Sequence, residues 1–87
     1  MSRIGTVVVT KQTTDLLESE VQAEYDGTVA YNKIRHGSPD APSDKQWVEI
    51  LRRLKATWQV EYHYEAQVLN NACAAVRERN RAGEKET

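Results

Sequence analysis

The chain has little of several features that mark common classes of protein. It has one cysteine, Cys73, among 87 residues, which excludes a disulfide framework and a cysteine-based zinc site. It has no apolar run near the roughly 18 residues of a membrane span and no pattern of a signal peptide, so we expect a cytoplasmic protein. It has no excess of one charge, with 12 basic and 13 acidic residues, which disfavours a general polyanion binder.

Catalytic motifs are also missing. His36 and His63 are the only histidines, and the sequence places no serine or cysteine nucleophile beside either of them. Cys73 falls within an apolar stripe, where a small core residue is the simplest interpretation. We therefore expect a chain that is not an enzyme and that uses neither a metal nor a cofactor.

The strongest positive signal is a long amphipathic pattern in the second half of the chain. Ser43 and Gln46 are spaced as a capping box directly after Pro42, and Gly83 is a stop signal. These signals predict one helix over residues 44–82, which would be about 39 residues and about 58 Å long. Its apolar stripe, at about 3.6 residues per repeat, consists of Trp47, Leu51, Leu54, Trp58, Tyr62, Ala66, Leu69, Cys73 and Val76.

The first half predicts an arm, a helix and a loop. The β-branched segment Arg3–Thr10 indicates a strand or extended arm within residues 1–12. A helix is predicted over residues 14–35, and the pair Asp26–Gly27 indicates either a turn or a weak point costing about 1 kcal/mol within a continuous helix. Residues 36–43 form a proline-containing loop, and residues 83–87 form a tail.

The predicted first helix carries two apolar ridges on different faces. One ridge contains Leu17, Val21, Tyr25 and Val29, and the other contains Leu16, Ala23, Ala30 and Ile34. Two ridges indicate either a helix with more than one neighbour or a break at Gly27.

The fold class predicted from these elements is all-α, a single domain over residues 1–87 built as a helical hairpin. Folding the chain back after Ser43 places Ile34 near Trp47 and Val21 near Val60. The apolar face of the long helix spans about 160°, more than one small helix covers. We therefore expect a homodimer or higher oligomer in the form of a helical bundle.

One polar anomaly interrupts the apolar face. Glu61 and Glu65 are four residues apart and so lie on one side of a helix, with Glu65 in the middle of the apolar face. Such a carboxylate needs a partner, and a local salt bridge or hydrogen bond is the main interpretation. The alternatives are a polar position that fixes oligomer register and a contact with a ligand or partner. A metal site is disfavoured, because the Glu-x-x-His pair of bundle metal sites is absent.

These features favour a small protein-binding module that acts as an adaptor, inhibitor or structural subunit. Small chains with balanced charge are common among phage-encoded regulators that block a host protein complex, and we keep that type as an expectation. Aromatic and charged helix surfaces would make the contacts. The candidate partner-binding residues are Trp47, Arg52, Arg53, Trp58, Glu61, Tyr62, Tyr64 and Glu65.

Two alternatives stay open. The order of strand, helix, Asp-Gly turn and helix over residues 3–35 resembles that of ribbon-helix-helix DNA-binding proteins, although few bases flank the candidate strand. That resemblance implies a DNA-binding regulator, and the patch Arg52–Lys55 would be a second nucleic-acid surface. The other alternative is an oligomer that sequesters a small ligand or nucleotide near Glu61, Glu65 and the tyrosines.

Overall fold

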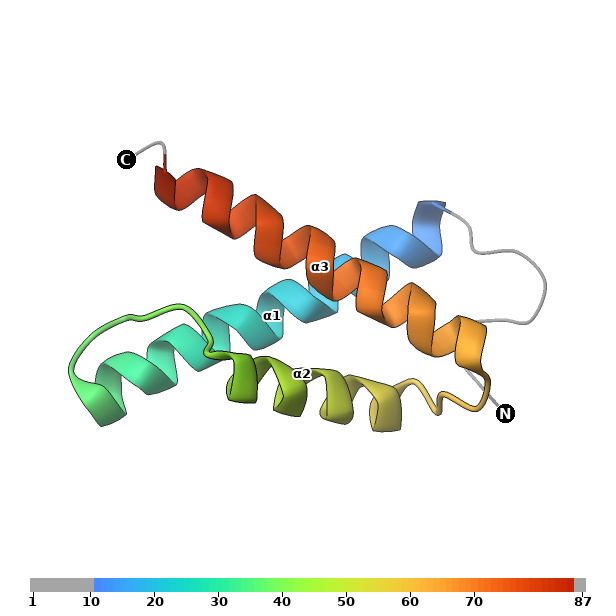
Figure 1. Ribbon diagram of the computed structural model, residues 1–87, viewed down its shortest axis with the longest axis horizontal. Helices are drawn as coiled ribbons and strands as arrows, with labels where there is room; N and C mark the ends of the chain where they lie inside the picture. The colour runs from blue at the N-terminus through green and yellow to red at the C-terminus, as the bar shows by residue number, and fades with distance from the viewer. Residues whose placement is uncertain (1–10, 86–87) are drawn as a thin grey trace.

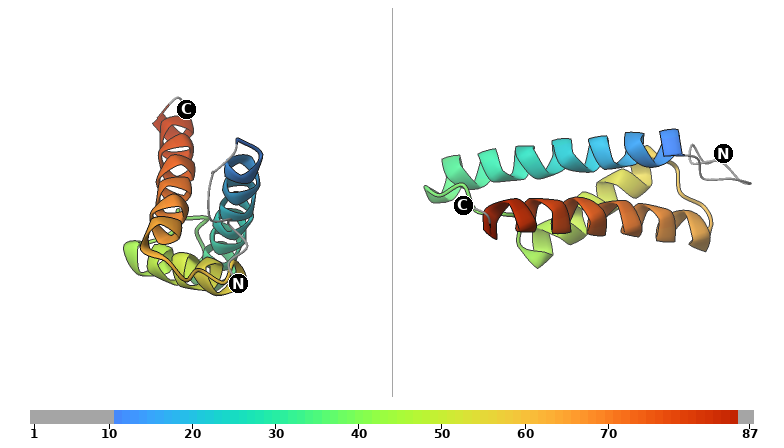
Figure 2. Two further views of the ribbon diagram at one scale, coloured as in Figure 1. Left: turned by 90° about the vertical axis from the view of Figure 1, so that its right-hand side faces the viewer. Right: turned by 90° about the horizontal axis from the view of Figure 1, so that it is seen from above.

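The computed structural model describes residues 11–85, and these residues form three helices without a strand. The helices are α1 (Lys11–His36), α2 (Asp44–Thr57) and α3 (His63–Lys85). Each helix contacts both others, and α2 runs antiparallel to α1 and α3 (Figures 1 and 2). The all-α prediction is therefore confirmed. Of the predicted arm over residues 1–12, residues 1–10 lie outside the described part, and Lys11 and Gln12 are already helical.

Helix α1 is continuous, so the turn considered at Asp26–Gly27 is absent. A Cβ built at Gly27 would meet no atom within 4 Å, so nothing around this position requires a glycine. The helix ends at Gly37, whose φ of 82° is left-handed and whose N–H donates to the Lys33 carbonyl at 3.0 Å. The predicted end of the first helix near residue 35 is confirmed.

The start of α2 follows the capping box predicted from the sequence. Ser43 Oγ accepts from the Gln46 N–H at 3.2 Å, and Gln46 Oε1 accepts from the Ser43 N–H at 3.0 Å. The same Gln46 side chain exchanges hydrogen bonds with Asn32 of α1, at 2.8 and 3.2 Å. Asn32 is only 4% exposed and also donates to the Asp40 carbonyl at 3.0 Å. This buried amide fixes the loop and the start of α2 against α1.

The core lies where the three helices meet. Its buried apolar residues are Leu17, Val21, Tyr25, Trp47, Ile50, Leu54, Trp58, Leu69, Ala72 and Val76. The first predicted ridge of α1 faces this core. The second ridge is on the outside, with Leu16 49% and Ile34 86% exposed. Of the two predicted ridges, one is therefore covered within the chain and the other is not.

The prediction of one helix over residues 44–82 was wrong, because the chain turns at residues 58–62. Gln59 has a φ of 53°, the left-handed conformation that ends many helices. The Val60 N–H donates to the Lys55 carbonyl at 3.0 Å, and the Gln59 N–H donates to the Ala56 carbonyl at 3.2 Å. These two bonds define a Schellman motif, which usually has glycine at the left-handed position. Glutamine gives no such signal, and so the stop was missed.

The turn changes which residues face one another. The antiparallel pairing of α1 with the first part of the long segment was predicted correctly, but about one helical turn out of register. Val21 was expected near Val60, whereas the neighbouring Glu20 accepts a hydrogen bond from the Trp58 indole. Ile34, expected near Trp47, is exposed. Beyond the turn, α3 packs along α1. The three-helix arrangement covers part of the broad apolar face of residues 44–82, whose width had predicted a second copy.

The continuity of α1 predicts that Gly27→Ala stabilises the protein. Alanine is favoured over glycine in a helix interior by about 1 kcal/mol, and the added methyl group meets nothing within 4 Å. The free energy of unfolding, measured by urea denaturation, should rise by about that amount. A decrease, measured at a concentration where the protein is monomeric, would indicate that residues 26–27 form a turn.

The turn at Gln59 predicts opposite effects of glycine at two positions. Gln59→Gly should raise the free energy of unfolding by about 1 kcal/mol, because a left-handed conformation costs a non-glycine residue about that much. Ala74→Gly, at an exposed position within α3, is the matched control and should lower it by about 1 kcal/mol. If both substitutions destabilise equally, residue 59 is inside a continuous helix.

Candidate interaction surface at the turn between α2 and α3

The turn between α2 and α3 is held against α1 by Trp58. This side chain is 3% exposed, and its indole N–H donates to the carboxylate of Glu20 on α1. Val60, two residues later, is half-buried against the core. The turn is therefore fixed at its first part by apolar burial and by one hydrogen bond to another helix.

Glu65 holds the second part of the turn. Its side chain is fully buried, and Oε1 accepts from the Tyr62 N–H at 3.0 Å and from the Glu61 N–H at 3.3 Å. Glu65 lies in the first turn of α3, and its bond from the Tyr62 N–H is the one that the acidic residue of a capping box accepts at a helix start. The interpretation as a local hydrogen bond is confirmed. The Glu61 side chain is exposed, and its backbone N–H bonds to Glu65.

Two tyrosines project from this fixed segment. Tyr62 is 53% and Tyr64 is 41% exposed, and their rings stack with centroids 5.9 Å apart and planes 14° apart. Partial desolvation, the charge of Glu65 and the neighbouring Tyr62 raise the pKa of Tyr64 above its ordinary value. Since an ordinary tyrosine already titrates near pH 10, the Tyr64 phenol stays protonated at neutral pH and can donate a hydrogen bond.

The two tryptophans do not belong to this surface, which corrects their selection as partner anchors. Trp47 is 8% and Trp58 is 3% exposed. Trp47 packs against Tyr25 with ring centroids 6.0 Å apart, and the Arg77 guanidinium lies 5.6 Å from its ring centroid. Both indoles therefore stabilise the core of the single chain.

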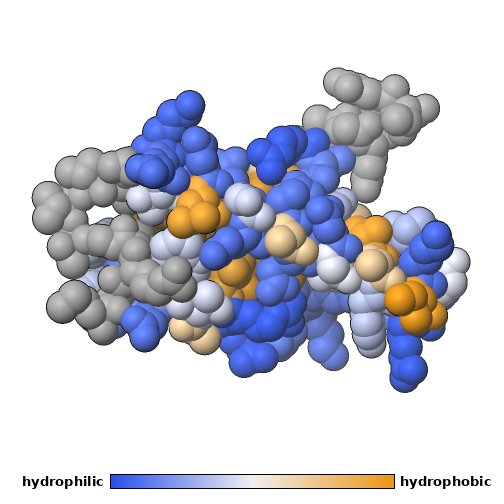
Figure 3. Space-filling view, turned by 180° about the vertical axis from the view of Figure 1, so that it is seen from behind, coloured by the Kyte–Doolittle hydropathy of each residue, from blue (hydrophilic) through white to orange (hydrophobic). Residues whose placement is uncertain are grey.

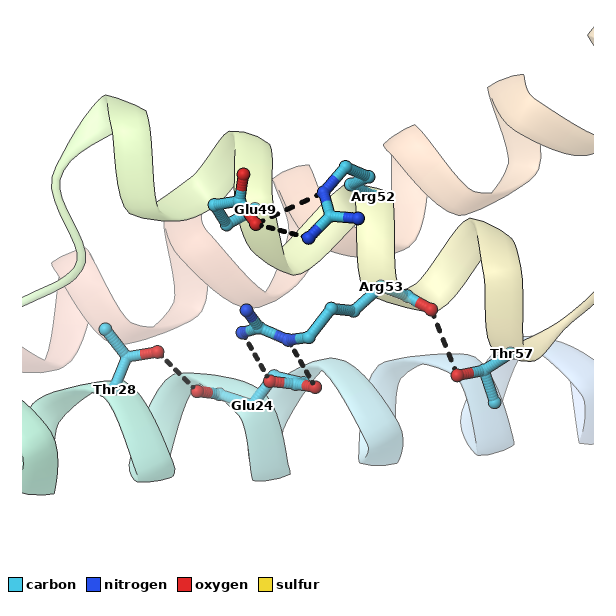
Figure 4. Close-up of polar contacts among 6 residues, drawn as sticks. All are labelled: Glu24, Thr28, Glu49, Arg52, Arg53 and Thr57. Atoms are coloured by element: carbon cyan, nitrogen blue, oxygen red, sulfur yellow. Dashed lines mark hydrogen bonds and ion pairs between the residues drawn. The ribbon is translucent and has the colours of Figure 1, made fainter.

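The two candidate arginines are paired with carboxylates. Arg52 Nη2 lies 2.8 Å from Glu49, and Arg53 Nη2 lies 2.9 Å from Glu24 on α1. Figure 4 shows Arg53 reaching across from α2 to α1. The hydrogen bond and charge of Arg52 lower the pKa of Glu49, and the bond to Glu24 raises the pKa of Arg53. These pairs neutralise two of the three bases in the patch Arg52–Lys55 that the sequence had indicated.

A groove of about 490 Å³ lies between α1 and α2 beside these pairs. Its charged groups balance, with two acids and two bases, so it has no net attraction for a polyanion. Its polar side chains also bond within the chain, as the Thr28 hydroxyl does to the Glu24 carbonyl at 2.9 Å (Figure 4). The lining residues are Glu24, Gly27, Thr28, Tyr31, Lys45, Gln46, Glu49 and Arg53.

Other kinds of site have no support in residues 11–85. No group of three histidine, cysteine, aspartate or glutamate side chains in this part could hold a metal ion. Burial raises the pKa of the Cys73 thiol to about 11, so the reactive thiolate is scarce at neutral pH. None of the three helices is long and apolar enough to cross a membrane.

The site residues predicted from the sequence therefore separate into three groups. Tyr62, Tyr64 and Glu61 lie together at the surface of the turn, Arg52 and Arg53 lie on α2, and Trp47, Trp58 and Glu65 are buried. Comparisons with protein-family models, with curated proteins and with solved structures found no match to this chain.

The capping role of Glu65 predicts a graded loss of stability. Glu65→Ala leaves two backbone N–H groups without this acceptor and should lower the free energy of unfolding by about 2–3 kcal/mol. Glu65→Gln keeps an acceptor of the same shape and should lower it by less than half as much. Glu78→Ala, at an exposed acid farther along α3, is the control and should have little effect. Equal losses for the alanine and glutamine variants in urea denaturation would contradict the capping role.

Proposed function

We propose that this chain is a small, non-enzymatic protein-binding module whose contact surface is the turn carrying Tyr62 and Tyr64. One observation supports the proposal most directly: two half-exposed, stacked tyrosines stand on a turn whose neighbours, Trp58 and Glu65, are buried and hydrogen-bonded. The roles considered for the module are those of an adaptor, an inhibitor or a structural subunit.

The physical basis is that fixed aromatic side chains lose little conformational entropy on binding. A tyrosine has few rotatable bonds, a large apolar surface and a polar tip, and tyrosine is enriched among residues that dominate binding energy. Stacking of the two rings and anchoring of the turn reduce the ordering cost further. The matching partner surface is apolar and accommodates the two exposed, stacked rings.

The two alternatives have less support. A ribbon-helix-helix arrangement needs a turn near residues 26–27, where α1 is continuous. A phosphate-binding patch needs unpaired bases, and two of the three bases in the patch Arg52–Lys55 are bonded to a carboxylate. A ligand pocket that uses Glu65 needs that side chain to be accessible, and it is fully buried.

A photo-crosslinking experiment in cells of the source organism tests the proposal. Benzoylphenylalanine at position 62 keeps an aromatic ring at the surface and should yield a discrete adduct with a different protein. The same group at Glu78, an exposed position on α3, is the control and should yield none. Adding Tyr64→Ala to the position-62 protein should lower the adduct yield about tenfold or more, as expected for a residue that dominates binding.

Two readouts keep the result specific. Circular dichroism should show unchanged helicity for each variant, because both tyrosines are outside the core. Two differently tagged copies should separate adducts with a second protein from adducts between copies. Equal adducts from positions 62 and 78, or an adduct yield that Tyr64→Ala leaves unchanged, would contradict the proposal.

A further inference from the structure

The outward face of α1 has a pattern of residues that neither α2 nor α3 packs against. Six positions on this face are separated alternately by four and three residues, which is the spacing of a coiled-coil seam. Apart from Glu20, which bonds to Trp58, all of them are exposed, with Leu16 49% and Ile34 86% exposed at the two ends. The positions, called the outer seam below, are Leu16, Glu20, Ala23, Gly27, Ala30 and Ile34.

The view from behind shows hydrophobic residues separated by hydrophilic ones across one face of the molecule (Figure 3). Isolated exposed apolar residues are normal at a protein surface. The outer seam differs because its apolar and small residues follow the heptad period for eighteen residues, a length of about 27 Å. That period predicts a helix as the occupant of this face.

The outer seam is also symmetric about position 25. An antiparallel copy of α1 would place Leu16 opposite Ile34 of the second copy and Ala23 opposite Gly27 of the second copy. The two large residues would thus meet at the ends, and the smallest residues would meet at the centre, where two backbones could approach closely. We propose that a second copy of this chain docks on the outer seam, with its α1 antiparallel to the first.

Charges beside the outer seam favour the same orientation. Asp15 and Lys33 are exposed on the side toward α3, and neither forms an ion pair with another residue in the described range. Antiparallel docking brings Lys33 within about one helical turn of Asp15 of the second copy, and the symmetry repeats this pair. Parallel docking would instead place the Asp15–Lys33 flank of one copy on the side opposite to the same flank of the second copy, so neither charge would gain this partner.

One nearby acid limits the strength of this contact. Asp26, which accepts from the Gln22 amide at 3.0 Å, would lie near Asp26 of the second copy at the axis. On the side toward α2, Glu24 is neutralised by Arg53. A short seam with one repulsive pair fits a weak dimer, with a dissociation constant between about 1 μM and 1 mM. This contact does not involve Tyr62 or Tyr64. A result against the contact would therefore leave the proposed function unaffected, and the reverse also holds.

A charge-exchange experiment tests both the occupant and its orientation. Sedimentation equilibrium of the full chain across that concentration range should show a reversible dimer. Lys33→Glu and Asp15→Lys should each weaken dimerisation about tenfold or more, because each places like charges together twice. An equimolar mixture of the two variants should restore association, since every juxtaposition then joins opposite charges.

Matched controls place the same charge changes elsewhere. Arg81→Glu and Glu78→Lys, on the exposed side of α3, should leave dimerisation unchanged within about twofold. The inference is overturned if the wild type stays monomeric, if the α1 variants dimerise as the wild type does, or if their mixture gains no association. Restoration by mixing requires folded variants, so misfolding cannot imitate it. The weakening of each single variant tests the antiparallel orientation, because that orientation brings Lys33 near Asp15 of the second copy.

Discussion

The tertiary structure depends on the reversal of the chain between α2 and α3. One residue in a left-handed conformation, Gln59, ends α2, and Val60 then packs on the core. Trp58 and Glu65 hold the two sides of this reversal through burial and hydrogen bonds. Because α3 then returns along α1, all three helices contribute to one core, and the broad apolar face of residues 44–82 is divided between two helices that face each other.

The parts that sequence predicted correctly have local causes. The capping box of Ser43 and Gln46 forms within four residues, and the ridge Leu17–Val21–Tyr25 follows from helical periodicity alone. The reversal has no comparable signal, because glutamine replaces the usual glycine and the apolar period continues through the turn. Glu65 looked anomalous for the same reason. The prediction placed it inside one long helix, where a buried carboxylate has no capping role.

The candidate site was predicted in part, and the division again follows the turn. Tyr62 and Tyr64 are exposed at the segment singled out by sequence, but Trp47 and Trp58 are in the core. Periodicity identifies an apolar stripe without saying whether another helix of the same chain covers it. The expectation of a second copy rested on the uncovered width of one long helix. That reason is gone, and the outer face of α1 is where the proposed contact between copies now lies.

The distance between positions 44 and 77 tests the chain reversal most directly. Asp44 and Arg77 form an ion pair of 2.8 Å in the bundle, whereas a continuous helix would separate them by about 50 Å. Spin labels at these two positions, with Cys73 replaced by alanine and excess unlabelled protein added to suppress contacts between copies, give this distance by electron–electron double resonance. The three-helix bundle predicts a separation below about 20 Å, from an interaxial distance near 10 Å plus the label linkers. A separation near 50 Å would contradict it.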